Sequence, residues 1–246
     1  MRIIISPAKK MRVDTDTLPW TDLPTFLEDA ERLSDWVRGL SYAEQKQLWA
    51  CSDKIAMQSS EQYAHMNLRG ELTPALLAYD GIQYAYMAPT VFEDGHFAYV
   101  QEHLRILSGL YGILRPMDGV VPYRLEMQAK LTMPGYKSLY EYWGRRLYDE
   151  AMDESRILIN LASGEYARVM KRYIGPKDRF VSVVFGELKG DRVVQKGVYV
   201  KMARGEMVRY LADAQADDPE CMRDFRWSGY AFDEGRSTPL CYTFVR

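Results

Sequence analysis

The chain has 246 residues, of which 47% are hydrophobic and 27% charged, and its formal net charge is −2. These values are those of an ordinary globular protein, and the length suffices for one large domain or two small ones with a substantial core. No apolar run approaches the roughly 20 residues that span a bilayer, so we expect no membrane segment. The slightly acidic total gives no global reason to expect a nucleic-acid partner.

The three cysteines, Cys51, Cys221 and Cys241, are far apart and odd in number. This pattern disfavours a disulfide framework, and the spacing is not that of a metal site. Residues 1–7 contain no apolar run long enough for the core of a signal peptide. We therefore expect a cytoplasmic protein.

The first part of the chain predicts one strand followed by several helices. The β-branched run of residues 2–6 is ended by Pro7, which is typical of a strand that enters a loop. Lys9 follows at the carboxyl end of this strand, where ligands commonly gather in open α/β sheets. Helices are predicted to begin near Pro24 with Thr21 or Asp22 as cap, at Ser41 with a Ser41–Glu44 capping box, at Ser52 and at Thr73, and a further helix spans residues 91–107.

Residues 103–127 combine three glycines and two prolines with many Leu, Ile, Val and Met side chains. Glycines permit positive φ or a close backbone approach, and each proline keeps the residue before it out of helical geometry. This composition favours buried scaffold that carries a shaped loop, with Arg115, Tyr123 and Arg124 directed at a ligand. The alternative is a tight connection in the core, whose arginines are solvated or paired with Asp118 and Glu126.

The second part of the chain alternates helices with strands. We predict helices over residues 136–150, 165–173 and 201–214, and strands over residues 156–162, 180–185, 192–196, 230–232 and 240–245. Neither an internal repeat nor a linker interrupts the chain. The sequence therefore predicts a single compact α/β domain over residues 1–246, in which a mixed β-sheet is surrounded by helices.

Charge is unevenly distributed along the chain. Residues 14–35 contain seven acidic side chains against one basic, a local balance of −6. Residues 166–210 contain eleven Lys and Arg against four Asp and Glu, a local balance of +7. This asymmetry predicts a basic face on a protein that is acidic in total. Ordinary solvated surface is the alternative.

Several sequence blocks, in order, resemble the signature of one known family. Residues 108–118 read Ser-Gly-Leu-Tyr-Gly-Ile-Leu-Arg-Pro-Met-Asp, and residues 122–127 read Pro-Tyr-Arg-Leu-Glu-Met. Further blocks are Ile5-Ser-Pro-Ala-Lys, Ser52-Asp-Lys, Tyr142-Trp-Gly, Asn160-Leu-Ala-Ser, Ala203-Arg-Gly and Gly229-Tyr-Ala-Phe-Asp. Together they resemble the bacterial YaaA family of peroxide-stress proteins. The resemblance implies a protein that limits free intracellular iron, binds DNA directly and carries a helix–hairpin–helix element.

Two interpretations of residues 105–116 stay open. Leu107-Ser-Gly-Leu-Tyr-Gly resembles the turn of a helix–hairpin–helix element, whose backbone N–H groups bind a DNA phosphate, although it has one extra residue between the glycines. Pro116 would also shorten the second helix. The competing interpretation is a buried strand, residues 105–108, that turns at Gly109. The family resemblance favours the helix–hairpin–helix.

The candidate site combines residues that follow the strand ends. If the strands near residues 2–6 and 156–162 are adjacent and parallel, the loops after them line one cleft with residues 108–115, and the neighbours of Gly164 face an anion with their N–H groups. Arginine suits a phosphate because its planar fork donates two hydrogen bonds, and Tyr111, Tyr123 and Trp143 offer faces on which bases can stack. The predicted DNA- or phosphate-binding residues are Ser6, Lys9, Ser108, Gly109, Tyr111, Gly112, Arg115, Tyr123, Arg124, Asn160, Ser163, Lys201 and Arg204.

Three functions follow from these candidates. The first is binding of double-stranded DNA without sequence preference, with no obligate protein partner. The second is an enzyme that acts on a nucleobase or nucleotide, with Glu126 or Glu165 as general base; the alternative for both is a salt bridge with Arg124 or Arg168. The third, an iron-binding protein, has less support because the histidines lack metal-site spacing. No Walker loop or dinucleotide fingerprint occurs, so we expect no cofactor.

Overall fold

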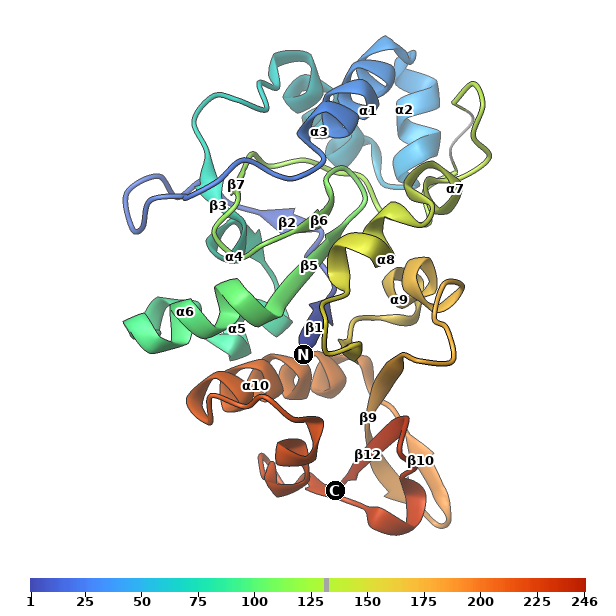
Figure 1. Ribbon diagram of the computed structural model, residues 1–246. Helices are drawn as coiled ribbons and strands as arrows, with labels where there is room; N and C mark the ends of the chain where they lie inside the picture. Colours follow the sequence, from blue (N-terminus) through green and yellow to red (C-terminus); the bar gives the residue numbers. More distant parts are fainter. Residues whose placement is uncertain (131–132) are drawn as a thin grey trace.

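A mixed sheet forms the centre of the molecule (Figure 1). The structure is a computed structural model and describes residues 1–130 and 133–246. Within these residues the sheet has eight strands in the order β11-β12-β9-β8-β1-β5-β6, and β10 pairs with β9. Strand β1 (Arg2–Ile5) lies between β8 (Ile157–Leu161) and β5 (Leu104–Ser108) and is parallel to both. Ile3, Ile4 and Ile5 are fully buried, as expected for a central parallel strand covered on both faces.

The remaining strands extend the sheet in both directions. Strand β9 (Arg179–Lys189) is parallel to β8 and to β12 (Cys241–Val245). Antiparallel partners are β6 (Gly112–Leu114) on β5, β10 (Arg192–Val194) on β9 and β11 (Ala231–Phe232) on β12. Two short ribbons pair β2 (Lys10–Met11) with β4 (Tyr79–Asp80) and β3 (Thr73–Pro74) with β7 (Gly119–Val120). The predicted α/β class with a mixed sheet is confirmed.

Helices cover the sheet and one end of the molecule. Figure 1 shows α1, α2 and α3 gathered at the top, α5 and α6 on one side, α8 and α9 on the other, and α10 below them. The helix bounds are α1 (Leu27–Gly39), α2 (Tyr42–Trp49), α3 (Asp53–His65), α4 (Ala75–Ala78), α5 (Ile82–Met87), α6 (Asp94–His103), α7 (Leu139–Trp143), α8 (Arg146–Ala151), α9 (Gly164–Lys171) and α10 (Gly197–Asp213). Short 3-10 turns occupy Pro89–Val91, Pro219–Asp224 and Glu234–Arg236.

Local signals predicted some helix boundaries and missed others. The Ser41–Glu44 capping box is formed in both directions at the start of α2. In contrast, α1 begins at Leu27 after Phe26, not beside Pro24. The helix predicted over residues 91–107 ends at His103, because Leu104 already pairs with Ile3 of β1. Residues 136–150 hold two helices, α7 and α8, instead of one.

Residues 104–114 form a β-hairpin, so the helix–hairpin–helix interpretation of this stretch is not confirmed. Strands β5 and β6 pair Ile106 with Leu114 and Ser108 with Gly112. The alternative that the sequence left open, a buried strand that turns at Gly109, is what is observed. The turn is buried: Ser108 and Tyr111 are both 0% exposed. Its backbone N–H groups are therefore not available to a DNA phosphate.

Candidate functional site

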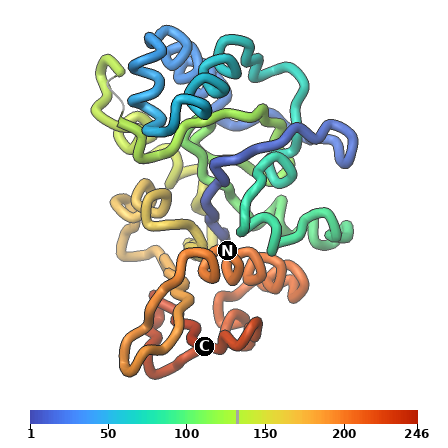
Figure 2. The backbone as a smooth tube through the Cα atoms, turned by 180° about the vertical axis from the view of Figure 1, so that it is seen from behind, coloured from blue at the N-terminus to red at the C-terminus, as the bar shows by residue number. Residues whose placement is uncertain are grey.

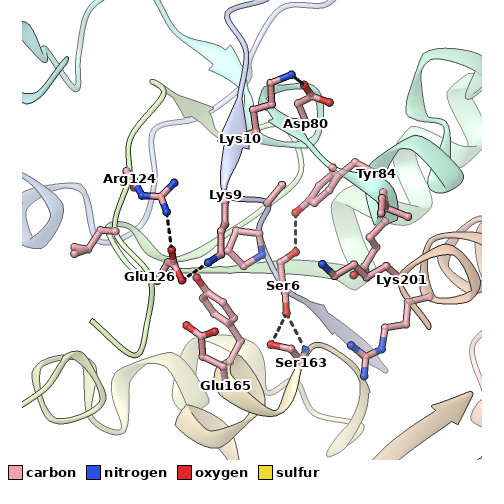
Figure 3. A pocket seen from close by; sticks show the side chains of 18 of the residues that line it. Ser6, Lys9, Lys10, Asp80, Tyr84, Arg124, Glu126, Ser163, Glu165 and Lys201 are labelled. Atoms are coloured by element: carbon pink, nitrogen blue, oxygen red, sulfur yellow. Dashed lines mark hydrogen bonds and ion pairs between the residues drawn. The ribbon is translucent and has the colours of Figure 1, made fainter. Parts of the chain in front are cut away.

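A cavity of about 460 Å³ opens at the carboxyl ends of β1 and β8. Because these strands are adjacent and parallel, the loops that follow them meet at one edge of the sheet. The residues that line the cavity come from the loop after β1, the start of α5, residues 123–126, the start of α9 and the first half of α10 (Figure 3): Ser6, Pro7, Ala8, Lys9, Lys10, Asp80, Gly81, Ile82, Gln83, Tyr84, Tyr123, Arg124, Leu125, Glu126, Ser163, Glu165, Tyr166, Lys201 and Arg204.

Ser6 joins three walls of the cavity. Its Oγ accepts a 2.8 Å hydrogen bond from the Ser163 backbone N–H and lies 3.2 Å from Ser163 Oγ, and its carbonyl oxygen accepts a 3.0 Å bond from the Tyr84 hydroxyl (Figure 3). These bonds connect the loop after β1 to the start of α9 and to α5. Two hydroxyl groups are thereby held side by side at the cavity wall.

Residues 123–126 reach the cavity because the chain passes very close to Gly109. A Cβ added at Gly109 would lie 2.1 Å from the Leu125 carbonyl oxygen, so only glycine allows this approach. The Tyr123 hydroxyl is hydrogen-bonded to Ser108 Oγ at 2.6 Å and to the Tyr79 hydroxyl at 2.9 Å. Buried polar groups that are paired in this way hold one rotamer, so the buried hairpin turn positions Tyr123 from behind.

The same segment is also held from the side of the helical layer. Seen from behind in Figure 2, the chain that follows β7 crosses beneath the helices at the top of the molecule. The Tyr63 hydroxyl of α3 donates a 3.3 Å hydrogen bond to the Arg124 carbonyl oxygen. Arg124 and Glu126 are therefore presented to the cavity from a backbone that is fixed at both faces.

Helix α10 brings two cations to the cavity through a close contact with α5. A Cβ added at Gly205 would lie 2.2 Å from the Gln83 carbonyl oxygen, so glycine at this position lets the two helices pack backbone to backbone. Lys201 and Arg204, which precede Gly205 on α10, line the cavity. Figure 3 shows the Lys201 side chain directed toward Ser6.

Five of the eight charged side chains that line the cavity form ion pairs with one another. Glu126 lies between Lys9, at 2.8 Å, and Arg124, at 3.2 Å. At the rim, Lys10 pairs with Asp80 at 2.9 Å. Lys201 and Arg204 form no salt bridge with a carboxylate among the described residues. Glu165 forms no salt bridge with a cation among the same residues. The alternative that the sequence left for Glu126, a salt bridge with Arg124, is thus what is observed.

Burial shifts the pKa values of two of these groups. Burial lowers the pKa of the Arg204 guanidinium to about 10, and no neighbouring carboxylate opposes the shift. Burial, and to a smaller extent the charge of Glu126, raise the pKa of the Glu165 carboxyl, although the Gln128 backbone N–H donates to its Oε1 at 3.2 Å. Both groups carry a desolvated charge that nothing in their surroundings fully compensates.

The cavity collects nine of the fifteen candidate residues. They are Ser6, Lys9, Tyr123, Arg124, Glu126, Ser163, Glu165, Lys201 and Arg204. Four of the five Lys and Arg candidates are among them. Arg115 is the exception, because β6 runs antiparallel to β5 and carries it away from the cavity, where it lies exposed, 3.9 Å from Glu150.

Five further candidates support the site without lining it. Ser108, Gly109, Tyr111 and Gly112 are buried in the hairpin, and Asn160 is buried in β8, where its Oδ1 accepts a 3.0 Å bond from the Ala162 N–H. Tyr111 and Trp143 are both 0% exposed. Their rings are therefore not available for base stacking, which corrects that expectation.

Sequence patterns did not identify the α5 wall of the cavity. Asp80, Gly81, Gln83 and Tyr84 line it, together with Tyr166 of α9. The one local signal was the Asp80-Gly81 dipeptide, which marks a turn. The approach of this turn to β1 depends on tertiary packing, since a Cβ at Gly81 would lie 2.8 Å from the Ala8 Cβ.

Within residues 1–130 and 133–246, no group of three or more His, Cys, Asp and Glu side chains is arranged to hold a metal ion. Of the helices described in these ranges, none has the length and apolarity that crossing a membrane requires.

The fold and the cavity define the class: an α/β protein whose central parallel strands carry a charged cavity of small-ligand size at their carboxyl ends. Residues 1–236 match the family described as peroxide stress protein YaaA. The chain belongs to this family, which confirms the resemblance and the general assignment to the peroxide-stress response.

Full-length relatives agree with this family assignment. UPF0246 proteins of Agathobacter rectalis and Desulfitobacterium hafniense are each 50% identical to the chain over 246 residues, which is all of this chain and 99% and 98% of the respective relatives. A UPF0246 protein of Lachnoclostridium phytofermentans is 47% identical over 246 residues, which is 96% of its length.

Proposed function

We propose that the protein serves the peroxide-stress response by binding DNA, and that the cavity holds the phosphate of one nucleotide. The observation that carries this proposal is the pair of cations on α10. Lys201 and Arg204 line the cavity and have no carboxylate partner among the described residues. An unpaired, desolvated guanidinium is unfavourable, and a phosphate that accepts its fork of hydrogen bonds relieves it.

The size of the cavity favours one nucleotide over a length of duplex. A volume of about 460 Å³ lies in the range of pockets for small ligands, and it is too small for the cross-section of a double helix. We propose that duplex DNA binds through phosphate contacts without sequence preference, while a single extruded or terminal nucleotide enters the cavity.

A second candidate is an enzyme that acts on a nucleotide or nucleobase. Glu165 favours it, because a half-buried carboxyl with a raised pKa and no cation partner among the described residues is a reasonable general base. Incubation of the protein with nucleotides and with damaged oligonucleotides, followed by mass spectrometry, tests this candidate. Absence of product from every substrate would eliminate it.

Limitation of free intracellular iron, and action in the cytoplasm, are part of the same proposal and rest on the family resemblance. If DNA binding serves the stress response, cells that carry only an Arg204→Gln variant should survive hydrogen peroxide as poorly as cells that lack the protein. Free iron measured by electron paramagnetic resonance in the same cells tests whether the two attributes depend on one cavity. Normal survival with Arg204→Gln would separate the cavity from the stress response.

Fluorescence anisotropy with a labelled duplex tests the DNA proposal directly. Binding should weaken steeply as salt rises, because phosphate contacts release counterions. Arg204→Gln should weaken binding, and Arg209→Gln is the matched control, since Arg209 lies on the same helix and pairs with Asp213 at 4.0 Å. A salt-independent affinity, or equal affinity of wild type and Arg204→Gln, would contradict the proposal.

A further inference from the structure

The ion pairs within the cavity leave three charged side chains without a partner among the described residues. Five cations and three carboxylates line it: Lys9, Lys10, Arg124, Lys201, Arg204, Asp80, Glu126 and Glu165. Lys9 and Arg124 share Glu126, and Lys10 takes Asp80. Among the described residues, the charges without a partner are then two cations on α10 and one carboxylate on α9.

These unpaired charges come from different walls. Lys201 and Arg204 belong to α10, whereas Glu165 lies in the first turn of α9. In Figure 3 Lys201 and Glu165 lie on opposite sides of the two serines, Ser6 and Ser163. The hydroxyl groups therefore lie between a cationic end and an end at which Glu165 and the Lys9–Glu126–Arg124 cluster offer both acceptors and donors.

Two hydrogen bonds hold Glu165 in place, one to its carboxyl group and one to its backbone carbonyl oxygen. Its Oε1 accepts the Gln128 backbone N–H at 3.2 Å, and its carbonyl oxygen accepts a 3.0 Å bond from the Tyr140 hydroxyl. No side chain among the described residues donates to this carboxyl group, although the Met127 backbone N–H and the charge of Lys9 lie close enough to lower its pKa. Arg168, the cation that the sequence offered as a partner, lies over the Tyr140 ring at 4.9 Å instead. This half-buried carboxylate can therefore accept a further hydrogen bond from a ligand N–H or O–H that replaces solvent.

We propose that the cavity selects a nucleotide whose phosphate contacts Lys201 and Arg204 and whose amine or hydroxyl group donates a hydrogen bond to Glu165. Glu165 is then a specificity-determining residue. This inference rests on the proposed function, because the phosphate end is the same, and it adds the chemistry of the other end. The donor is either an exocyclic amine of the base or a sugar hydroxyl, and both present an N–H or O–H to a carboxylate.

Isothermal titration with four mononucleotides distinguishes these sources. Cytosine carries an exocyclic amine where thymine carries a carbonyl oxygen, so dCMP and dTMP form one pair of probes. AMP and dAMP differ only in the 2′-hydroxyl and form the other pair. Tighter binding of dCMP than dTMP assigns the donor to the base, and tighter binding of AMP than dAMP assigns it to the sugar.

Glu165→Gln is the informative variant, because its amide oxygen can still accept the Gln128 N–H while the charge is removed. We expect it to weaken binding of the preferred nucleotide by about tenfold, the loss typical of a hydrogen bond to a charged group, and to abolish the preference within the pair. Glu61→Gln is the control, since Glu61 is exposed on α3 and does not line the cavity. Thermal unfolding of each variant verifies that the fold is intact.

The two levels of the proposal fail in different ways. If Arg204→Gln weakens all four nucleotides but Glu165→Gln changes no preference, the phosphate end stands and the inference about Glu165 is overturned. If Arg204→Gln has no effect on nucleotides or on duplex DNA, the proposed function itself fails. If none of the four mononucleotides binds the wild-type protein at millimolar concentration, the inference that the cavity selects a nucleotide is overturned.

Discussion

The backbone N–H of Ser163 donates a 2.8 Å hydrogen bond to Ser6 Oγ, across 157 residues of sequence. The bond ties the end of β1 to the start of α9, which are the two segments that follow adjacent parallel strands. It therefore sets the separation of the two loops that form the floor of the cavity.

Ser6→Ala should destabilise the protein. The substitution leaves the Ser163 N–H without its acceptor in a half-buried site, for which we expect a loss of about 1–2 kcal/mol in the free energy of unfolding. Ser60→Ala is a suitable control, because the Ser60 hydroxyl has no partner among the described residues and alanine suits a helix. Urea denaturation measures both. Equal stability of Ser6→Ala and wild type would show that the bond contributes nothing.

Gly205→Ala should push α10 away from α5. The added Cβ would lie 2.2 Å from the Gln83 carbonyl oxygen, and such overpacking typically destabilises a protein by about 1–3 kcal/mol. On the same helix, a Cβ at Gly197 meets nothing within 4 Å, so Gly197→Ala should be neutral. Thermal unfolding compares the two variants. Equal stability of Gly205→Ala and Gly197→Ala would contradict the prediction, because it would mean that α10 can move away from α5 without cost.

Tyr123→Phe removes the hydroxyl that joins Ser108 and Tyr79 beneath the cavity. Both partners are buried and lose a hydrogen bond, so we expect a decrease of about 1–3 kcal/mol in the free energy of unfolding. Tyr136→Phe serves as the control, because Tyr136 is 38% exposed. Guanidinium denaturation monitored by circular dichroism measures the difference, and identical midpoints for the two variants would contradict the prediction.

Asp118 should make stability depend on pH. Burial raises the pKa of its carboxyl from 3.8 to about 7. Because the folded protein holds the proton more tightly than the unfolded chain, stability decreases as pH rises from about 4 to 7. With about 1.4 kcal/mol per pKa unit, the penalty above pH 7 is at most on the order of 4 kcal/mol.

Asp118→Asn should remove this penalty while its side-chain oxygen still accepts the 2.8 Å bond from the Arg115 N–H. The variant is therefore expected to be more stable than wild type at pH 8 and similar to it at pH 4. Free energies of unfolding at these two pH values provide the measurement. If the difference in free energy of unfolding between wild type and Asp118→Asn is the same at pH 4 and pH 8, the raised pKa of Asp118 is excluded.

Features that depend on neighbouring residues were predicted well. The Ser41–Glu44 capping box needs only contacts within one turn, and it is formed. The apolar runs of β1 and β8 were long enough to indicate buried strands, and they are adjacent and parallel, as the cleft hypothesis required. For residues 104–108 local pattern was insufficient, because Leu and Ile suit a helix and a buried strand equally. Pairing with β1 selected the strand.

The sequence by itself determined the α/β class, the strands whose ends form the site, and nine of the residues that line the cavity. Only the tertiary structure decided which charges remain unpaired. Arg115 and Arg124 are nine residues apart, yet the first lies exposed near Glu150 and the second faces Glu126 in the cavity. The physical reason is that secondary structure follows from neighbours in the chain, whereas ion pairing follows from distances that the packing of the sheet and α10 sets.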